Sequence, residues 1–372
     1  MKIAILTLPL YSNYGGIMQN YALQTILKQM GHHVYTIDCP QIYKNKLWYN
    51  ICINKVKYAI KQALTKIGIE VPTIDNSSNN QFIQNHITFT SSLCPKKNNL
   101  SNLNHIGLNA IIVGSDQVWR YPYIQANVEN FFLDFIDNNI TKIAYSASFG
   151  VSYNEYPIQI QQKIKKLYSK FNRVSVREKS GLNLLKINDW KCAHPALITL
   201  DPTLLLNKED YNMLIEQNNN QSSKKIFCYI LDKNDEKCQI INRICEITAY
   251  EPDMININHD SKQIVIPSVE LWIKSFRDAD FIFTDSFHGC VFSIIYNKPF
   301  IVIANKKRGI ARFETLLNLF KLEDRIIYSK EDLNRDLIYK KINWEEIETI
   351  KNSKRQESIE FLKKALNKKN NE

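Results

Sequence analysis

The chain has 372 residues, of which 44% are hydrophobic, 11% aromatic and 23% charged. This composition excludes a disordered or collagen-like protein and indicates an ordinary globular one. The length exceeds the roughly 250–300 residues at which a single core stops growing, so we expect two domains. No stretch approaches the ~20 apolar residues that a membrane span requires, so we expect no transmembrane helix.

Lysine and arginine outnumber aspartate and glutamate by 48 to 37, which gives a net charge of +11. Such an excess favours an anionic partner, namely a phosphorylated small molecule, a nucleic acid or a membrane surface. The eight cysteines include no pair at two-residue spacing, so we expect neither a zinc ribbon nor a redox motif, and no metal. Residues 1–9 lack the pattern of a secretory signal, which favours free thiols in a reducing cytoplasm.

Strand-like apolar runs alternate with helical patterns in the first part of the chain. The apolar residues of 18–30 recur every three or four positions, and Gly31 ends that helix. The other elements expected are strands at 2–8, 34–37, 110–113, 142–146 and 173–176 and a helix near 155–171. Strands that alternate with helices predict a parallel sheet covered by helices.

A polar stretch near 207–225 is the best candidate for a domain boundary, because it cannot bury itself. The alternating pattern then restarts. The elements expected are strands at 225–231, 254–257, 281–284 and 300–303 and helices at 236–249, 267–278, 290–296 and 344–368. We therefore predict an α/β protein with two Rossmann-like domains, 1–206 and 207–343, whose parallel sheets face a cleft. A C-terminal helix within 344–372 is expected to cross back.

Polar turns follow four of the predicted strands. Ligands of open parallel sheets gather beyond the carboxyl ends of the strands, where helix N-termini point at them. We therefore expect the four turns to form one site in the cleft between the domains. The candidate site residues are Asn13, Gly15, Gly16, Ser115, Asp116, Gln117, Arg177, Asp285, Ser286, His288 and Gly289.

His288 is the most informative candidate, because it lies in a strand-to-helix turn beside a glycine. The helix dipole there favours a nearby anion, which suits a neutral histidine or one that gains a proton when an anion arrives. The alternative is a histidine that merely caps its helix. Arg177 suits bidentate capture of a carboxylate or phosphate, unless it forms a surface pair with Glu178 or a neighbouring acid. Asp116 is a candidate base or, alternatively, a helix cap.

Six motifs occur in an order that resembles the polysaccharide pyruvyl transferase family. They are Asn13-Tyr14-Gly15-Gly16 with Gln19 to Leu23, Val113 to Trp119, Tyr145 to Gly150, Val176 to Gly181, Asp201-Pro202-Thr203 and Thr284 to Gly289. The resemblance implies transfer of a pyruvyl group from phosphoenolpyruvate onto two hydroxyls of a sugar, which forms a cyclic ketal. It also implies a fold similar to glycosyltransferase-B enzymes, with the acceptor on the first domain and the donor on the second. Some members have an arginine two residues before the histidine, where this chain has Ser286.

The chemistry of this donor fits the candidate residues. Phosphoenolpyruvate carries a carboxylate and a phosphate, which cations and helix N-termini bind. We expect His288 to donate a proton or bind the phosphate, and Asp116 or Asp285 to act as the base. Arg177 and the remaining serine, glycine and amide candidates are expected to bind substrate, with no cofactor besides the donor. The resemblance implies as acceptor a lipid-linked precursor of a bacterial surface polysaccharide such as a capsule. The sugar modified is expected to be a galactose, at its 4- and 6-hydroxyls, or an N-acetylhexosamine.

The stretch 43–69 combines six lysines with aromatic and aliphatic residues and contains no acid. This pattern suits a helix that lies on an anionic membrane surface, beside the lipid-linked acceptor. It predicts a cytoplasmic enzyme at the inner face of the cell membrane. The alternative is an amphipathic helix that covers the sheet and exposes its lysines to solvent.

Two other functions compete with a pyruvyl transferase. A nucleotide-sugar-dependent glycosyltransferase would use the same two-domain architecture. A basic nucleic-acid-binding protein would explain the net charge, but the charge is spread over the chain and no recognised binding motif occurs, so we expect no nucleic-acid partner.

Overall fold

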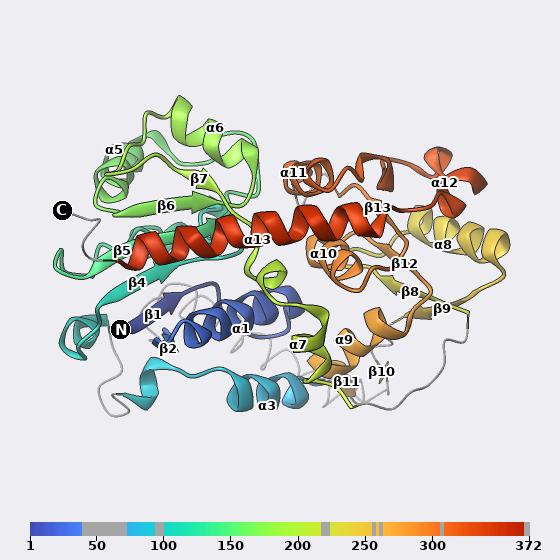
Figure 1. Ribbon diagram of the computed structural model, residues 1–372, viewed down its shortest axis with the longest axis horizontal. Coiled ribbons are helices and arrows are strands. Elements are labelled where there is room, and N and C mark those ends of the chain that lie inside the picture. The colour runs from blue at the N-terminus through green and yellow to red at the C-terminus, as the bar shows by residue number, and fades with distance from the viewer. Residues whose placement is uncertain are drawn as a thin grey trace, which may run out of the picture.

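Figure 1 shows the computed structural model of the protein. It describes residues 1–38, 73–93, 100–216, 224–254, 258–259, 263–305 and 309–367. The basic stretch 43–69 lies outside these residues. Two α/β domains lie side by side, and the long helix α13 (Trp344–Leu366) runs across both.

The first domain is built on a sheet of six parallel strands in the order β2-β1-β4-β5-β6-β7. The strands are β1 (Lys2–Leu6), β2 (His33–Thr36), β4 (Ala110–Val113), β5 (Thr141–Ala147), β6 (Arg173–Val176) and β7 (Leu197–Ile198). Alternate residues of a strand point to opposite faces. Ile3 and Ile5 accordingly join one hydrophobic core, and Ala4 and Leu6 join another. Burial on both faces explains why these strands have nearly continuous apolar sequences.

Helices cover both faces of this first sheet. Met18 and Leu23 of α1 pack in the core that contains Ile3, whereas Trp119 lies in the opposite core. The helices of this part of the chain are α1 (Tyr14–Gln29), α3 (Ser77–His86), α4 (Tyr121–Ile124), α5 (Ile158–Tyr168), α6 (Lys179–Ile187) and α7 (Lys208–Asn212).

The second domain is built on five parallel strands in the order β14-β13-β12-β8-β9. The strands are β8 (Lys225–Tyr229), β9 (Glu251–Met254), β12 (Phe281–Thr284), β13 (Phe300–Ile303) and β14 (Ile326–Ile327). Its helices are α8 (Asp235–Thr248), α9 (Val269–Asp278), α10 (Phe287–Ile295), α11 (Ala311–Leu319) and α12 (Arg335–Tyr339). The Ser268 side chain accepts a hydrogen bond from the Leu271 backbone N–H, which caps α9.

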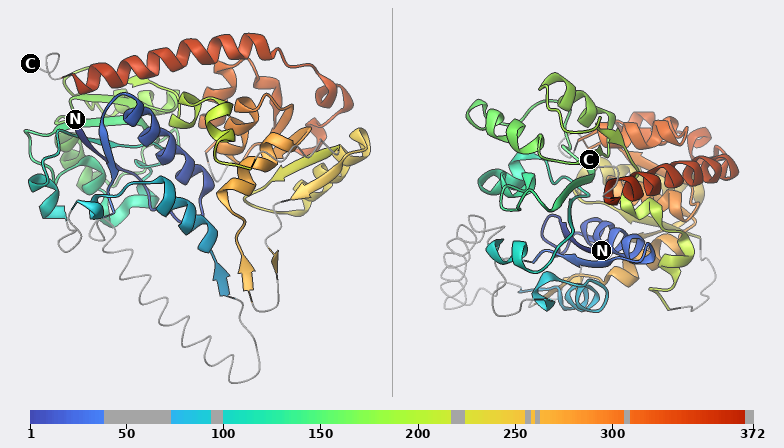
Figure 2. Two further views of the ribbon diagram at one scale, coloured as in Figure 1. Left: turned by 60° about the horizontal axis from the view of Figure 1, so that its bottom comes forward. Right: turned by 60° about the vertical axis from the view of Figure 1, so that its left-hand side comes forward.

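In the described part of the chain, a small sheet and a long helix join the domains in addition to a shared hydrophobic core. In a small sheet, β3 (Thr73–Asp75) pairs in parallel with β11 (Gln263–Val265), and β11 pairs with β10 (Asn258–His259). The second connection is α13, which pairs Glu346 with Lys321 near one end and packs Phe361 against Tyr145 of β5 near the other. Figure 2 shows α13 and the small sheet on opposite sides of the molecule.

The structure confirms the predicted fold class, with two parallel-sheet α/β domains and a C-terminal helix. The first sheet ends at Ile198 and the second begins at Lys225, while the domain bounds at 206 and 343 stay predictions. Of the strand predicted at 254–257, residues 255–257 lie outside the described part of the chain, and Met254 ends β9. β9 occupies Glu251–Met254 in register with β8, and this partly exposed edge strand contains too few apolar residues to show itself in the sequence.

Candidate active site

The N-termini of two helices, one from each domain, meet at His288. This histidine lies in the first turn of α10, and Gly15 lies in the first turn of α1. A Cβ atom added to Gly15 would lie 2.0 Å from Nδ1 of His288, so only glycine lets the imidazole pack against the start of α1. The His288 residue is 6% exposed. The structure therefore brings together two of the four predicted turns at one side chain.

Asp201 receives His288 on the side of the first domain. Its Oδ2 atom lies 3.6 Å from Nε2 of His288 and accepts a 2.7 Å hydrogen bond from Arg177. Its Oδ1 atom accepts hydrogen bonds from the backbone N–H and the hydroxyl of Thr203. Ser115 Oγ lies 3.3 Å from Oδ2 as a further donor. These contacts fix the carboxylate, so Asp201 presents a negative charge to the imidazole in a defined position.

Arg177 joins two of the predicted turns in the same cluster. Its guanidinium donates to Asp201 at 2.7 Å and to Asp116 at 3.1 Å, and it lies over the ring of Phe287 at 4.4 Å. The three charged side chains are 2%, 0% and 7% exposed, respectively for Arg177, Asp201 and Asp116. The interpretation of Arg177 as a surface partner of Glu178 is therefore wrong. Two carboxylates already balance its charge, which the sequence did not indicate.

The cluster sets the ionisation of its carboxylates. Burial alone would raise the pKa of Asp201, but His288 and Arg177 hold that pKa well below its usual range. Burial would also raise the pKa of Asp116, but neighbouring cations lower it, and Arg177 has the largest effect among them. Burial raises the pKa of Glu178, although Arg177 and Arg312 oppose the increase. Asp116 and Asp201 are thus carboxylates at neutral pH.

Asp285, predicted as an alternative base, has another role. Its Oδ1 atom accepts from the Leu231 backbone N–H at 2.7 Å, and its Oδ2 atom accepts from the Asp232 N–H at 3.1 Å. The ammonium of Lys237 also donates to Oδ2, at 2.7 Å. Both oxygens are therefore engaged within the second domain, where the carboxylate ties the ends of β12 and β8 together. The assignment of Asp285 as the base is wrong for this physical reason.

The other predicted residues shape the site rather than carry charge. Ser286 caps α10 by accepting a hydrogen bond from the Gly289 backbone N–H, at 3.4 Å. A Cβ atom on Gly289 would lie 2.2 Å from Oγ1 of Thr284, so glycine is required where the helix meets β12. Asn13 is the exposed residue that precedes α1. A Cβ atom on Gly16 would lie 3.0 Å from Nδ2 of that asparagine.

Ser115 and Gln117 are buried beside Asp116. The Ser115 backbone N–H donates to Oε1 of Gln19, and its hydroxyl also lies 2.9 Å from the Ser146 carbonyl. Oε1 of Gln117 accepts from Arg120 at 3.1 Å. Ser115 thus contacts the cluster through Asp201, whereas no contact in the described part of the chain joins the Gln117 side chain to His288.

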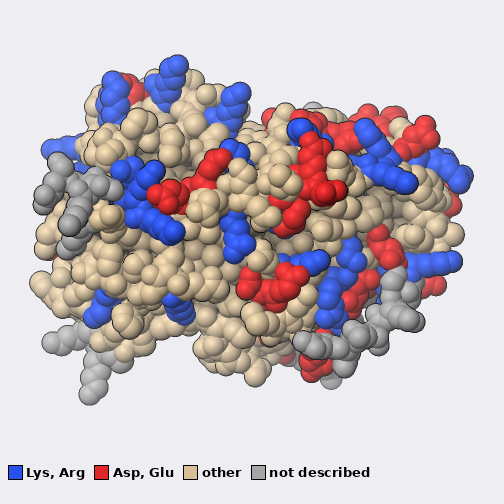
Figure 3. All heavy atoms as spheres, in the orientation of Figure 1, with Lys and Arg blue, Asp and Glu red and all other residues tan. Residues whose placement is uncertain are grey.

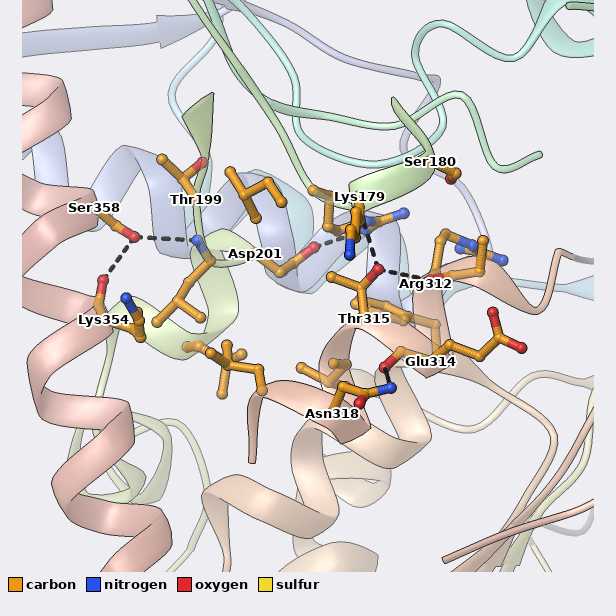
Figure 4. A pocket seen from close by; sticks show the side chains of 18 of the residues that line it. Lys179, Ser180, Thr199, Asp201, Arg312, Glu314, Thr315, Asn318, Lys354 and Ser358 are labelled. Carbon is orange, nitrogen blue, oxygen red and sulfur yellow. Dashed lines mark hydrogen bonds and ion pairs between the residues drawn. The ribbon is translucent and has the colours of Figure 1, made fainter. Parts of the chain in front are cut away.

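A cavity of about 690 Å³ opens beside this cluster, between the two domains and α13. Figure 4 shows Lys179 and Arg312 at one end of it and Lys354 and Ser358 of α13 at the other. Asp201 lies between the two ends (Figure 4). Such a volume is typical of small-molecule sites, which lie preferentially where domains meet.

Three buried charged residues of this region were not predicted as functional residues from the sequence. Asp201 is part of the motif Asp201-Pro202-Thr203, to which no role was assigned. In sequence it resembles an ordinary cap of the turn Pro202–Leu205. Glu178 accepts hydrogen bonds from the backbone of Phe149 and Gly150, and nothing in its sequence context indicates burial. Arg312 lies in α11, a helix that the sequence pattern did not predict. Within the described ranges, no group of three His, Cys, Asp or Glu side chains is arranged to hold a metal ion.

Solved structures define the class of fold. The chain resembles UDP-N-acetylglucosamine 2-epimerase from Rickettsia bellii with a TM-score of 0.50 and 9% identity, over 98% of this chain and 97% of that one. It resembles UDP-GlcNAc 2-epimerase from Neisseria meningitidis bound to UDP-GlcNAc with a TM-score of 0.50 and 12% identity, over 98% and 100%. These likenesses show the glycosyltransferase-B type of fold, in which two Rossmann-like domains face each other.

The sequence assigns the chain to a family within that fold. The family described as polysaccharide pyruvyl transferase matches residues 13–307, which is most of the chain. The protein therefore belongs to the polysaccharide pyruvyl transferase family, and this membership indicates a pyruvyl transferase enzyme. A comparison with curated protein sequences gives no match. Among the helices that the structure describes, none has the length and apolar character needed to cross a bilayer.

Proposed function

We propose that the protein transfers a pyruvyl group from phosphoenolpyruvate onto two hydroxyls of one sugar, with release of phosphate. Family membership supports the transferase class. The observation that carries the proposal is the meeting of His288, Arg177 and Asp116 around the carboxylate of Asp201, at the N-termini of α1 and α10. This arrangement suits a small anion and a proton transfer.

The reaction needs one proton on carbon and two new C–O bonds. Protonation of the methylene carbon of phosphoenolpyruvate makes a cationic centre at the adjacent carbon, which the first sugar hydroxyl attacks. The phosphate then leaves with its bridging oxygen, and the second hydroxyl closes the ketal ring. Of the two hydroxyl protons, one replaces the proton that entered the new methyl group and the other leaves with the phosphate. The balance requires neither an oxidant nor a second co-substrate.

In this proposal His288 acts on the donor, as a proton donor or as a ligand of the phosphate. Oδ2 of Asp201 lies 3.6 Å from Nε2 of this histidine. Asp116 remains the candidate base, although Arg177 lowers its pKa and so makes it a weak one. Loss of a proton donor lowers kcat with little change in the KM for phosphoenolpyruvate, whereas loss of a phosphate ligand raises that KM. The kinetics of His288→Gln therefore separate the two roles.

The acceptor that we propose is a lipid-linked precursor of a bacterial surface polysaccharide, with the 4- and 6-hydroxyls of galactose as the first to test. The enzyme would then act at the inner face of the cell membrane. On the face shown in Figure 3, Lys and Arg side chains are dispersed and alternate with Asp and Glu, which supports a small anionic ligand over a nucleic acid. Flotation with anionic liposomes at low salt tests the contact proposed through 43–69, and absence of binding would refute it.

The decisive experiment combines binding with turnover. Phosphoenolpyruvate should raise the melting temperature of the protein, and phosphate release should depend on both the donor and a member of a lipid-linked sugar panel. The competing function is a nucleotide-sugar-dependent glycosyltransferase, since one structural neighbour is described as bound to UDP-GlcNAc. Stabilisation by UDP- or GDP-sugars without stabilisation by phosphoenolpyruvate would favour that alternative and end our proposal.

A further inference from the structure

A second buried arginine lies beside the cluster, on the opposite domain. Arg312 is in the first turn of α11 and is 5% exposed. Its guanidinium carbon lies 5.5 Å from the ring centroid of Phe287, and that of Arg177 lies 4.4 Å from the same centroid. Phe287 directly precedes His288 in α10. Two guanidinium groups, one from each domain, thus contact one ring next to the proposed catalytic histidine.

Both arginines belong to a group of buried charges. Arg177 is in direct contact with two carboxylates, those of Asp116 and Asp201. Burial and the like charge of Arg177 lower the pKa of Arg312 to about 10, against the opposing influence of Asp116 and Glu178. Arg312 is therefore still charged at neutral pH, in a place where burial and a neighbouring cation both disfavour the charge. An anion that binds between the domains would offset this cost.

Arg312 lines the cavity between the domains, so a ligand in that cavity can reach it. Arg312, Arg177 and Lys179 line the same 690 Å³ space, together with Phe287 and Asp201. Figure 4 shows Arg312 and Lys179 directed toward one end of that space. A planar guanidinium presents two parallel N–H donors, which match the oxygens of a carboxylate or phosphate. Three cationic side chains thus line the cavity, together with the carboxylates of Asp201 and Glu314.

We propose that Arg312 binds an anionic group of the donor, its carboxylate or its phosphate, at this end of the cavity. The inference rests on the proposed function for the identity of the donor. It assigns the donor a contact with α11 of the second domain in addition to the cluster around Asp201. Arg312 is a binding residue in this proposal, and its loss weakens the affinity for anions without removing the groups that transfer protons.

The test measures binding by titration calorimetry with phosphoenolpyruvate, inorganic phosphate and pyruvate as separate ligands. We expect Arg312→Gln to weaken binding of phosphoenolpyruvate at least tenfold, and Arg312→Lys to recover part of that loss because it keeps the charge. The matched control is Arg243→Gln, which removes the same charge from an exposed pair with Glu246 on α8. This control should bind like the wild type, and melting temperatures should show that each variant is folded.

The outcomes separate the inference from the proposed function. Equal affinity of the wild type and both Arg312 variants for phosphoenolpyruvate would overturn the inference and leave the proposed donor intact. Binding of phosphate but not phosphoenolpyruvate by the wild type, lost in Arg312→Gln, would overturn the proposed donor and keep the anion site. If Arg312→Gln does not fold, unchanged affinity in a folded Arg312→Lys overturns the inference, because the ammonium lacks the planar donor pair. Absence of binding of all three anions to the wild type overturns both.

Discussion

The contact between Gly15 and His288 gives the sharpest prediction. In Gly15→Ala the added methyl carbon would lie 2.0 Å from Nδ1 of the imidazole, whereas ordinary contacts begin at 3.4 Å. The ring would therefore have to retreat by about 1.4 Å, which is more than the ~1 Å displacement that can cost a factor of 10² in rate. Retreat is obstructed because Asp201 lies 3.6 Å from Nε2 on the other side.

We expect Gly15→Ala to lower kcat by about 10²-fold or more through displacement of His288. Overpacking of this kind typically costs ~1–3 kcal/mol of stability, so the variant should still fold. The assay is acceptor-dependent phosphate release from phosphoenolpyruvate, with the melting temperature measured in parallel.

The matched control is Gly31→Ala, just after the other end of the same helix. Gly31 has a φ of +83°, and a Cβ atom there would have no neighbour within 4 Å. An alanine in this left-handed conformation costs about 1–2 kcal/mol but leaves His288 in place. Gly31→Ala should therefore lower the melting temperature and keep kcat. A Gly15→Ala enzyme that turns over within a few-fold of the wild type would refute the reasoning.

Three further predictions concern the charged groups around this histidine. His288→Ala should lower turnover by about 10²–10⁴-fold with little loss of melting temperature, and near-normal turnover would contradict its role. Asp285→Ala should destabilise the fold by about 3–5 kcal/mol in urea titrations, since it leaves Lys237 buried without its partner, while the folded enzyme keeps its kcat. The third is a pH effect. Because Arg177 and His288 depress the pKa of Asp201, its ionised form stabilises the fold above about pH 4, and this stabilisation is lost as the pH falls toward the folded-state pKa. Asp201→Asn should flatten the fall in unfolding free energy between about pH 4 and pH 2, and an unchanged acid slope would contradict the assignment.

The sequence predicted elements where the physical signal was local. Apolar strands such as 110–113 and 281–284 agree with β4 and β12 in their bounds, because burial on both faces leaves an uninterrupted apolar pattern. Residues 251–253 of the edge strand β9 and the two-residue strand β7 were missed, since short or exposed strands carry little pattern. The pairing of β3 with β11 joins residues almost two hundred positions apart, which no local pattern indicates.

The candidate site shows the same division. The strand-end rule correctly placed His288, Gly15, Arg177 and Asp116 near one another, because parallel strands end at a common edge. The rule could not tell which side chains face the cleft. Asp285 occupies an equivalent strand end, yet hydrogen bonds from its own domain hold it. Partner choice among buried charges depends on tertiary geometry, so it became visible only in the structure.

The helix α13 and the small sheet constrain how ligands enter and leave the space between the domains. The helix α13 contacts both domains on one side, and the backbone pairing of β3 with β11 joins them on the other (Figure 2). A large rotation of one domain away from the other would have to bend α13 or separate β3 from β11. Ligands of the cavity would therefore have to enter and leave while the two domains stay close together. The same links keep the groups around His288 in a fixed arrangement. They also restrict the hinge motion by which many two-domain enzymes release product.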